Sequence, residues 1–132
     1  MNTIEKGNFS VAKVIVKFLE KRYIVAQPVG EGYHYDLVVD IKGTLYRVQV
    51  KTGSFKNGCV CSDSRINCNR KSRNHKSRKR KNYTTEIDYF AIYCPKLDKV
   101  YLVPVDEHGY LRVDAPKRNT CKNINWAKDY EI

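Results

Sequence analysis

The sequence contains no long apolar run. No stretch approaches the roughly 18 residues that a helix needs to span a bilayer. Residues 1–6 contain no basic segment followed by an apolar stretch, which is the pattern of a secretory signal. We therefore expect no membrane partner. The expected location is the cytoplasm, or an organelle stroma after removal of a transit peptide.

The number of cysteines is odd. Five cysteines without an export signal favour reduced thiols over disulfides. A zinc site is a minor alternative, because the Cys-x-Cys spacing matches poorly the Cys-x(2–4)-Cys pairs of structural zinc sites. Its candidate ligands are Cys59, Cys61, Cys68 and His75.

Acidic residues are absent from residues 65–82, which carry nine Lys or Arg. The chain has 25 basic and 14 acidic residues, a net charge of +11, so removing those nine leaves 16 against 14, a net of +2. Nearly all the excess charge therefore lies in one segment. Such a patch is typical of a polyanion-binding protein, because neutralising phosphates releases counterions. A solvated segment that only keeps the protein soluble is the alternative.

The length and composition predict one folded domain. The 132 residues suffice for one core but not two, and 42% hydrophobic with 11% aromatic residues is ordinary for a globular protein. No repeat or linker marks a second domain. We expect a single domain over residues 1–132, with a basic loop at about residues 65–82.

Apolar residues at helical spacing predict an amphipathic helix over residues 9–22, with Asn8 as its N-cap. The remaining elements are expected to be strands, apart from a short helix or cap near the end. The strands are predicted at residues 23–26, 59–66, 88–94 and 100–105, and the helix or cap at residues 123–130.

A β-hairpin is predicted over residues 36–51, since two β-rich runs flank a two-residue turn with glycine second. If residues 41 and 44 pair across this turn, the numbers of every further cross-strand pair also sum to 85. This register places Asp36 directly opposite Gln49.

The two faces of the hairpin differ in chemistry, because successive strand side chains point to opposite sides. One face carries apolar and aromatic side chains and is expected to face the core. The other concentrates polar groups within one or two cross-strand neighbours. These groups are Asp36, Asp40, Arg47, Gln49 and Lys51.

The polar face has the groups that phosphodiester hydrolysis requires. A divalent cation needs hard oxygen ligands, which Asp36, Gln49 and the Val50 carbonyl can supply. Lys51 can orient the attacking water and offset developing charge. We interpret Asp36, Gln49 and Lys51 as candidate catalytic residues. The alternative is an exposed ion pair between Asp36 and Lys51, worth only about 0.2–1 kcal/mol.

The pattern Pro28…Asp36…Gln49-Val50-Lys51 resembles the PD-(D/E)XK nuclease superfamily. It is most similar to the branch of bacterial group I intron homing endonucleases, in which glutamine replaces the usual acid before X-Lys. The resemblance covers most of the chain in collinear order. It includes residues 7–8, 28–30, 35–37, 48–53, 83, 87–93, 100–105 and 124–131.

The resemblance implies a restriction-endonuclease-like, three-layer α/β fold with a mixed central β-sheet flanked by helices. It also implies Mg²⁺ (or Mn²⁺) as cofactor and site-specific cutting of double-stranded DNA. Two opposed cuts need two active sites, so a homodimer or higher homo-oligomer is expected. The glutamate on this family's first helix falls at Val11, which cannot bind a metal. Either Asn8 or Glu5 then helps indirectly, or the site carries one fewer carboxylate.

Two other functions share the hairpin. A Holliday-junction resolvase-like nuclease would read DNA shape, and a degenerate nuclease fold would bind DNA without cutting it. In either case we expect phosphate contacts from basic residues. The candidates are Lys56, Arg65, Arg70, Lys71, Arg73, Arg78, Lys79, Arg80 and Lys81.

Replacing Arg78, Lys79, Arg80 and Lys81 with serine should flatten the slope of log DNA affinity against log salt concentration. Each lost phosphate contact changes that slope by about 0.9. Fluorescence anisotropy with duplex DNA at several salt concentrations measures both slopes. Coinciding slopes for variant and parent would show that the segment serves only solubility.

Overall fold

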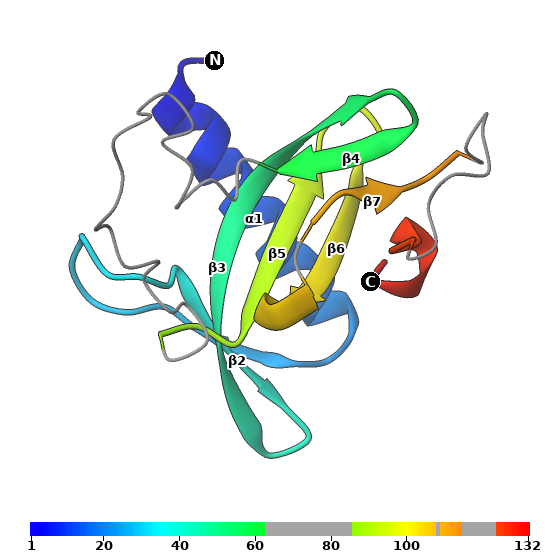
Figure 1. Ribbon diagram of the computed structural model, residues 1–132. Helices are drawn as coiled ribbons and strands as arrows, with labels where there is room; N and C mark the ends of the chain where they lie inside the picture. Colours follow the sequence, from blue (N-terminus) through cyan, green and yellow to red (C-terminus); the bar gives the residue numbers. More distant parts are fainter. Residues whose placement is uncertain (63–85, 108, 115–123) are drawn as a thin grey trace, which may run out of the picture.

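The computed structural model of the chain describes residues 1–62, 86–107, 109–114 and 124–132. One helix, α1 (Thr3–Glu20), lies across one face of a β-sheet (Figure 1). The strands are β1 (Ile24–Ala26), β2 (Leu37–Ile41), β3 (Thr44–Lys56), β4 (Cys59–Ser62), β5 (Tyr89–Cys94), β6 (Lys99–Pro104) and β7 (Leu111–Arg112). Two short 3₁₀ helices follow β6 and β7, η2 (Val105–Glu107) and η3 (Ala127–Asp129).

Helix α1 begins at Thr3, so the prediction of Asn8 as its N-cap was wrong. Asn2 is the N-cap: its side chain accepts a hydrogen bond from the Glu5 amide at 2.9 Å. The Glu5 carboxylate in turn accepts one from the Asn2 amide at 2.9 Å. This reciprocal capping box satisfies two backbone donors at once, which makes it a stronger start signal than a single asparagine.

The hairpin has the predicted register. Ile41 pairs with Thr44 and Leu37 pairs with Val48, so the partner numbers sum to 85 throughout. Lys42 and Gly43 both have positive φ, 52° and 89°, as a two-residue hairpin turn with a matching twist requires. The Asp40 carboxylate accepts a hydrogen bond from the Gly43 amide at 2.8 Å and braces this turn.

The sheet is mixed, as expected. Strand β3 pairs in parallel with β5 and antiparallel with β2 and β4. Strand β1 extends the sheet beyond β2, and β6 extends it beyond β5. At the other end, β7 pairs with β4. The predicted third strand is present as β4 up to Ser62, and its predicted continuation to residue 66 lies outside the described residues.

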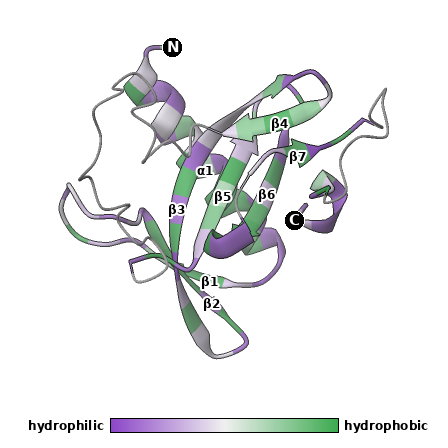
Figure 2. Cartoon of the chain, in the orientation of Figure 1, coloured by the Kyte–Doolittle hydropathy of each residue, from purple (hydrophilic) through white to green (hydrophobic). Residues whose placement is uncertain are grey.

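Two hydrophobic cores lie on the two faces of the sheet. The first lies under α1, where Val14 and Phe18 pack against Leu37, Val39 and Val48, all five fully buried. This is the face of the hairpin that was predicted to be apolar. The second core packs between β5, β6, β4, β7 and η3. Figure 2 shows the strands β4 and β6 as mostly hydrophobic.

The end of the chain closes the edge of β6. The Leu102 amide donates to the Tyr130 carbonyl at 2.9 Å, and the Ile132 amide donates to the Val100 carbonyl at 3.1 Å. The short helix predicted near Trp126 is η3, and Ala127 rather than Trp126 is its buried residue. The helix α1 on one face of a mixed sheet confirms the expected α/β fold. In the described ranges the second face is covered by β4, β7 and η3 rather than by a second α-helix. No helix in these ranges combines the length and the apolarity that crossing a membrane requires.

Strand β3 continues to Lys56, beyond the predicted end at residue 51. Along β3, pairing with β2 ends at Val48, opposite Leu37, and pairing with β4 begins at Gly53, opposite Ser62. Residues 49–52 therefore have no strand neighbour on that edge within the described part of the chain. We call this stretch the β3 gap.

Gly53 should be intolerant of a side chain. A Cβ there would come within 2.8 Å of Ile92 Cγ2 and 3.2 Å of Val60 Cγ1, both in the second core. Gly53→Ala should lower the free energy of unfolding by about 1–3 kcal/mol through overpacking. Gly7→Ala is the matched control, because nothing lies within 4 Å of a Cβ at Gly7 in α1. It should stabilise the protein by about 0.5–1 kcal/mol. Urea denaturation measures both, and equal stability of Gly53→Ala and the parent would contradict the packing argument.

Candidate active site

Asp36 lies at the start of the β3 gap and takes the place of a strand partner. Its amide donates to the Val48 carbonyl at 2.9 Å. Its carboxylate oxygen Oδ2 accepts a hydrogen bond from the Val50 amide at 2.8 Å. The side chain of Asp36 thus satisfies a backbone donor that a longer β2 would have paired.

The Val50 carbonyl faces the same edge as Asp36, because the N–H and C=O of one strand residue point to the same side. A carboxylate and a carbonyl oxygen therefore meet at the β3 gap. Both are hard oxygen donors of the kind that Mg²⁺ and Ca²⁺ prefer. The Asp36 carboxylate thus lies beside the backbone of Val50, and their joint role as metal ligands stays a prediction.

Gln49 lies on the face opposite α1 and pairs with Phe90 of β5. Its Oε1 atom is buried and has no hydrogen-bond partner among the described residues. A buried oxygen left unpaired costs about 1–3 kcal/mol, so native proteins rarely keep one without a use. The donor set of Asp36, Gln49 and Val50 therefore fits a divalent cation. Within the described ranges no three His, Cys, Asp or Glu side chains form a metal-binding group of their own.

Lys51 follows two residues after Gln49 and shares its face. It is half-buried and pairs with Ile92 of β5. The structure therefore places Gln49 and Lys51 on one short stretch of β3, and Asp36 lies against that stretch at Val50. The paired part of the hairpin, which ends at Leu37 and Val48, has the predicted register, and the direct pairing of Asp36 with Gln49 stays a prediction.

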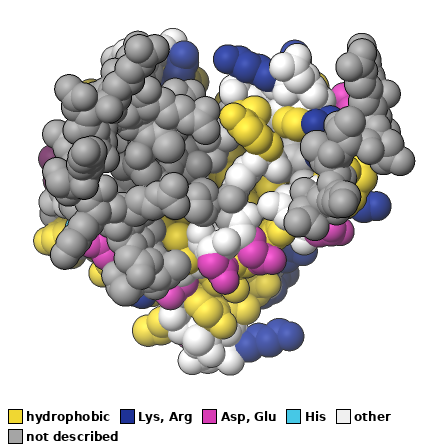
Figure 3. All heavy atoms as spheres, viewed as in Figure 1, with side chains coloured by type: hydrophobic (Ala, Val, Ile, Leu, Met, Phe, Trp, Pro, Cys, Tyr) yellow, Lys and Arg dark blue, Asp and Glu magenta, His cyan; other side chains and the backbone are white. Residues whose placement is uncertain are grey.

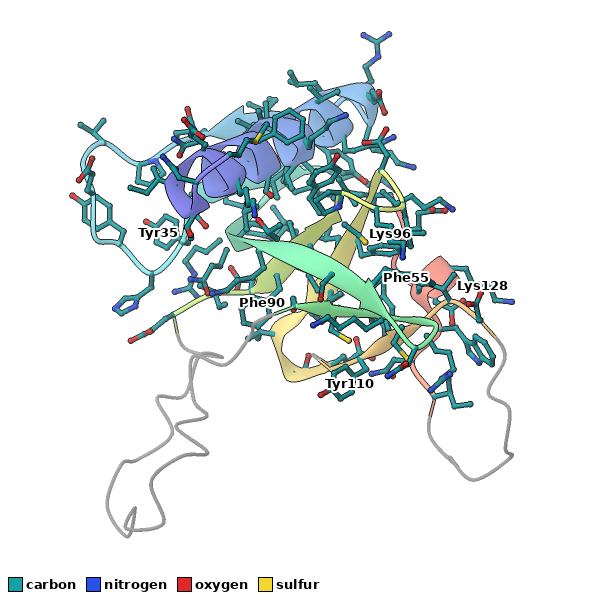
Figure 4. All side chains as sticks on the ribbon, turned by 90° about the horizontal axis from the view of Figure 1, so that it is seen from above. Tyr35, Phe55, Phe90, Lys96, Tyr110 and Lys128 are labelled. Carbon is teal, nitrogen blue, oxygen red and sulfur yellow. The ribbon has the colours of Figure 1, made fainter. Side chains whose placement is uncertain are left out.

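A cavity of about 600 Å³ opens beside Asp36, between α1 and residues 27–36. Figure 4 shows Tyr35, one of its lining residues, beneath the N-terminal half of α1. The helix contributes Asn8, Val11, Ala12 and Ile15 to the cavity wall, so no carboxylate of α1 reaches it. Val11 thus lies in the cavity wall, at the position where the resemblance implies an acidic residue. Asn8 also lines the cavity, and the Glu5 side chain is held in the capping box of α1.

Glu31 is a cavity residue that the sequence did not single out. It stands in the wall formed by residues 27–36, between Gly30 and Gly32, whose φ angles are 103° and 81°. The two flanking glycines indicate a loop, and nothing in the sequence places that loop at the cavity. Glu31 and Asp36 are the two acidic residues of this cavity.

An ion pair between Arg47 and Asp88 lies next to the site, two residues before Gln49 on β3. The Arg47 guanidinium binds the Asp88 carboxylate through Nε and Nη2, each at 3.3 Å. The Arg47 amide also donates to Asp88 at 2.7 Å. Burial raises the pKa of Asp88, but these hydrogen bonds outweigh burial and hold the pKa below its ordinary value. The pair therefore stays ionised and closes the end of the β3–β5 ladder.

His34 and Glu86 form a second contact at this end of the sheet. His34 Nδ1 lies 3.2 Å from Glu86 Oε2, which is an ion pair when the imidazole is protonated. The same oxygen is buried and has no hydrogen-bond partner among the described residues. The contact is therefore one between charges, with no catalytic role.

Most of the predicted DNA-binding residues lie outside the described residues. Lys56 is described, at the end of β3, and is exposed. Figure 3 shows Lys and Arg side chains standing singly over the described part of one face. Of the zinc candidates, Cys68 and His75 also lie outside the described residues, and Cys59 and Cys61 are free thiols.

Comparison with known proteins identifies a family and a similar fold. A sequence profile of the PD-(D/E)XK endonuclease family matches residues 1–132, the whole chain. Among solved structures, the fold is similar to that of the bacterial homing endonuclease I-Ssp6803I, with a TM-score of 0.64 and 25% sequence identity. The similarity covers 98% of this chain and 86% of that one. No curated protein sequence matches the chain.

Proposed function

We propose that this chain, which belongs to the PD-(D/E)XK endonuclease family, is a single-domain, metal-dependent enzyme that hydrolyses phosphodiester bonds of double-stranded DNA. The observation that carries the proposal is the β3 gap. There the Val50 amide of β3 donates a hydrogen bond to the Asp36 carboxylate. The same strand carries Lys51 and Gln49, whose Oε1 atom is buried without a hydrogen-bond partner among the described residues.

Asp36, Gln49 and the Val50 carbonyl are the residues that would hold Mg²⁺ or Mn²⁺. When bound, the cation would polarise the phosphate and lower the pKa of water. The β3 ladder holds the Val50 carbonyl in place, and the Val50 amide fixes one Asp36 oxygen, so the donors are preorganised.

Lys51 supplies the positive charge of the site. Its ammonium group orients the attacking water and offsets the charge that develops on the phosphate oxygens. Gln49 is neutral, so it adds a donor oxygen without adding negative charge. With Val11 in place of a helix acid, the site carries less negative charge than a pocket with three carboxylates, and its cation affinity is expected to be correspondingly weak.

The structural similarity to a homing endonuclease supports site-specific cutting of both DNA strands, and hence a homodimer or higher homo-oligomer. Residues 65–82 supply phosphate contacts in this proposal. A second candidate is a DNA-binding protein without cleavage, which the missing α1 carboxylate favours. Incubating the protein and Mg²⁺ with a plasmid library that carries random inserts separates these functions. Discrete cut ends support the first, and tight binding without cutting supports the second.

Lys51→Ala should abolish cleavage while leaving the affinity for duplex DNA nearly unchanged, because it removes an interaction made in the transition state. Lys42→Asn is the matched control: Lys42 lies in the hairpin turn at positive φ, which asparagine tolerates. This control should cleave like the parent. Gel assays of cleavage and anisotropy assays of binding measure the two quantities. Full turnover by Lys51→Ala in Mg²⁺ would remove Lys51 from the catalytic assignment.

Gln49→Glu should bind Mn²⁺ more tightly than the parent, because a carboxylate is a better hard-cation ligand than an amide oxygen. Isothermal titration calorimetry without DNA measures the affinity independently of cleavage. Val11→Glu, which adds a carboxylate to the cavity wall, should shift the affinity in the same direction. Weaker Mn²⁺ binding by Gln49→Glu would mean that this side chain does not face the cation.

A further inference from the structure

Ser10 is a buried polar residue of α1, with 1% of its surface exposed. It lies on the face of α1 that also buries Val14 and Phe18. A hydroxyl group in apolar surroundings is unfavourable unless it forms a hydrogen bond. Its partner is Thr52, whose Oγ1 atom lies 2.6 Å from Ser10 Oγ.

Thr52 follows Lys51 directly and is the last residue of the β3 gap. In the gap, β5 supports one edge of β3, and on the other edge the described support is the hydrogen bond from Val50 to Asp36. Apolar packing of Val48 and Val50 under α1 is non-directional. The hydrogen bond between Ser10 and Thr52 is directional, so it fixes where α1 stands along β3.

The two partners connect the two halves of the site. Ser10 precedes Val11, which lines the cavity beside Asp36. Thr52 precedes Gly53, where β4 begins to pair, and follows Lys51. We propose that the Ser10–Thr52 hydrogen bond is a positioning contact. It holds residues 49–52 at one position along α1, and nuclease turnover depends on it. This inference rests on the proposed function for its activity readout.

The test uses Thr52→Val, which keeps the shape of the side chain and removes the hydroxyl, and Thr52→Ser, which keeps the hydroxyl. Thr52→Val should lower kcat by about 10- to 100-fold, the scale expected for misplaced catalytic groups, with KM for duplex DNA unchanged. Thr52→Ser should retain the kcat of the parent. Val103→Ala is the stability control, since Val103 is buried in the second core on the other face of the sheet. It should lose stability and keep its kcat at a temperature where circular dichroism shows it folded.

A second readout does not depend on cleavage. Hydrogen exchange of the Val50 amide, which binds Asp36, should be faster in Thr52→Val than in the parent and unchanged in Thr52→Ser. A parent protein that does not cleave DNA would refute the proposed function, and exchange alone would then decide the positioning role. Parental exchange at Val50 in Thr52→Val would overturn the proposal, as would parental kcat in that variant if the parent is active. If Thr52→Val does not fold, Ser10→Ala replaces it, because alanine suits the helix and removes the same bond.

Discussion

The β3 gap is the constraint on which the candidate site depends. A strand edge without a neighbour exposes backbone groups that must be satisfied in some other way. Here the Asp36 carboxylate binds the Val50 amide, so one acidic side chain both completes the sheet and presents an anion at its edge. The fold thereby fixes a potential ligand with a backbone hydrogen bond rather than with another side chain.

The same gap separates two parts of the sheet with different roles. Below it, the hairpin of β2 and β3 packs under α1 around Val48. Above it, β3 continues into the pairing with β4, where Gly53 allows Ile92 and Val60 to approach closely. The chemistry-bearing residues therefore lie between two rigid packed regions, an arrangement that suits groups that must hold their positions during a reaction.

Charge is divided between regions of the chain in a way that suits a nuclease. The described site holds few carboxylates, since Gln49 is neutral and Val11 is apolar, and the Arg47–Asp88 pair balances itself. Most of the net positive charge lies in residues 65–82, outside the described structure. In the proposed function, phosphate attraction and catalysis therefore belong to separate segments, and a change in one need not alter the other.

The sequence by itself determined the hairpin, its register and the polar face that carries Gln49 and Lys51, because strand alternation and turn chemistry are local rules. It also located the charge excess, because the position of charged residues along the chain is read directly from the sequence. Asn2 was missed as the N-cap because two competing asparagines lie close together in the sequence. Only the tertiary structure decided that neither β2 nor β4 pairs with residues 49–52 of β3. It also decided that Ser10 contacts Thr52 and that Glu31 lines the cavity. These features join residues from different elements, and the distances between them are set by packing rather than by any local pattern.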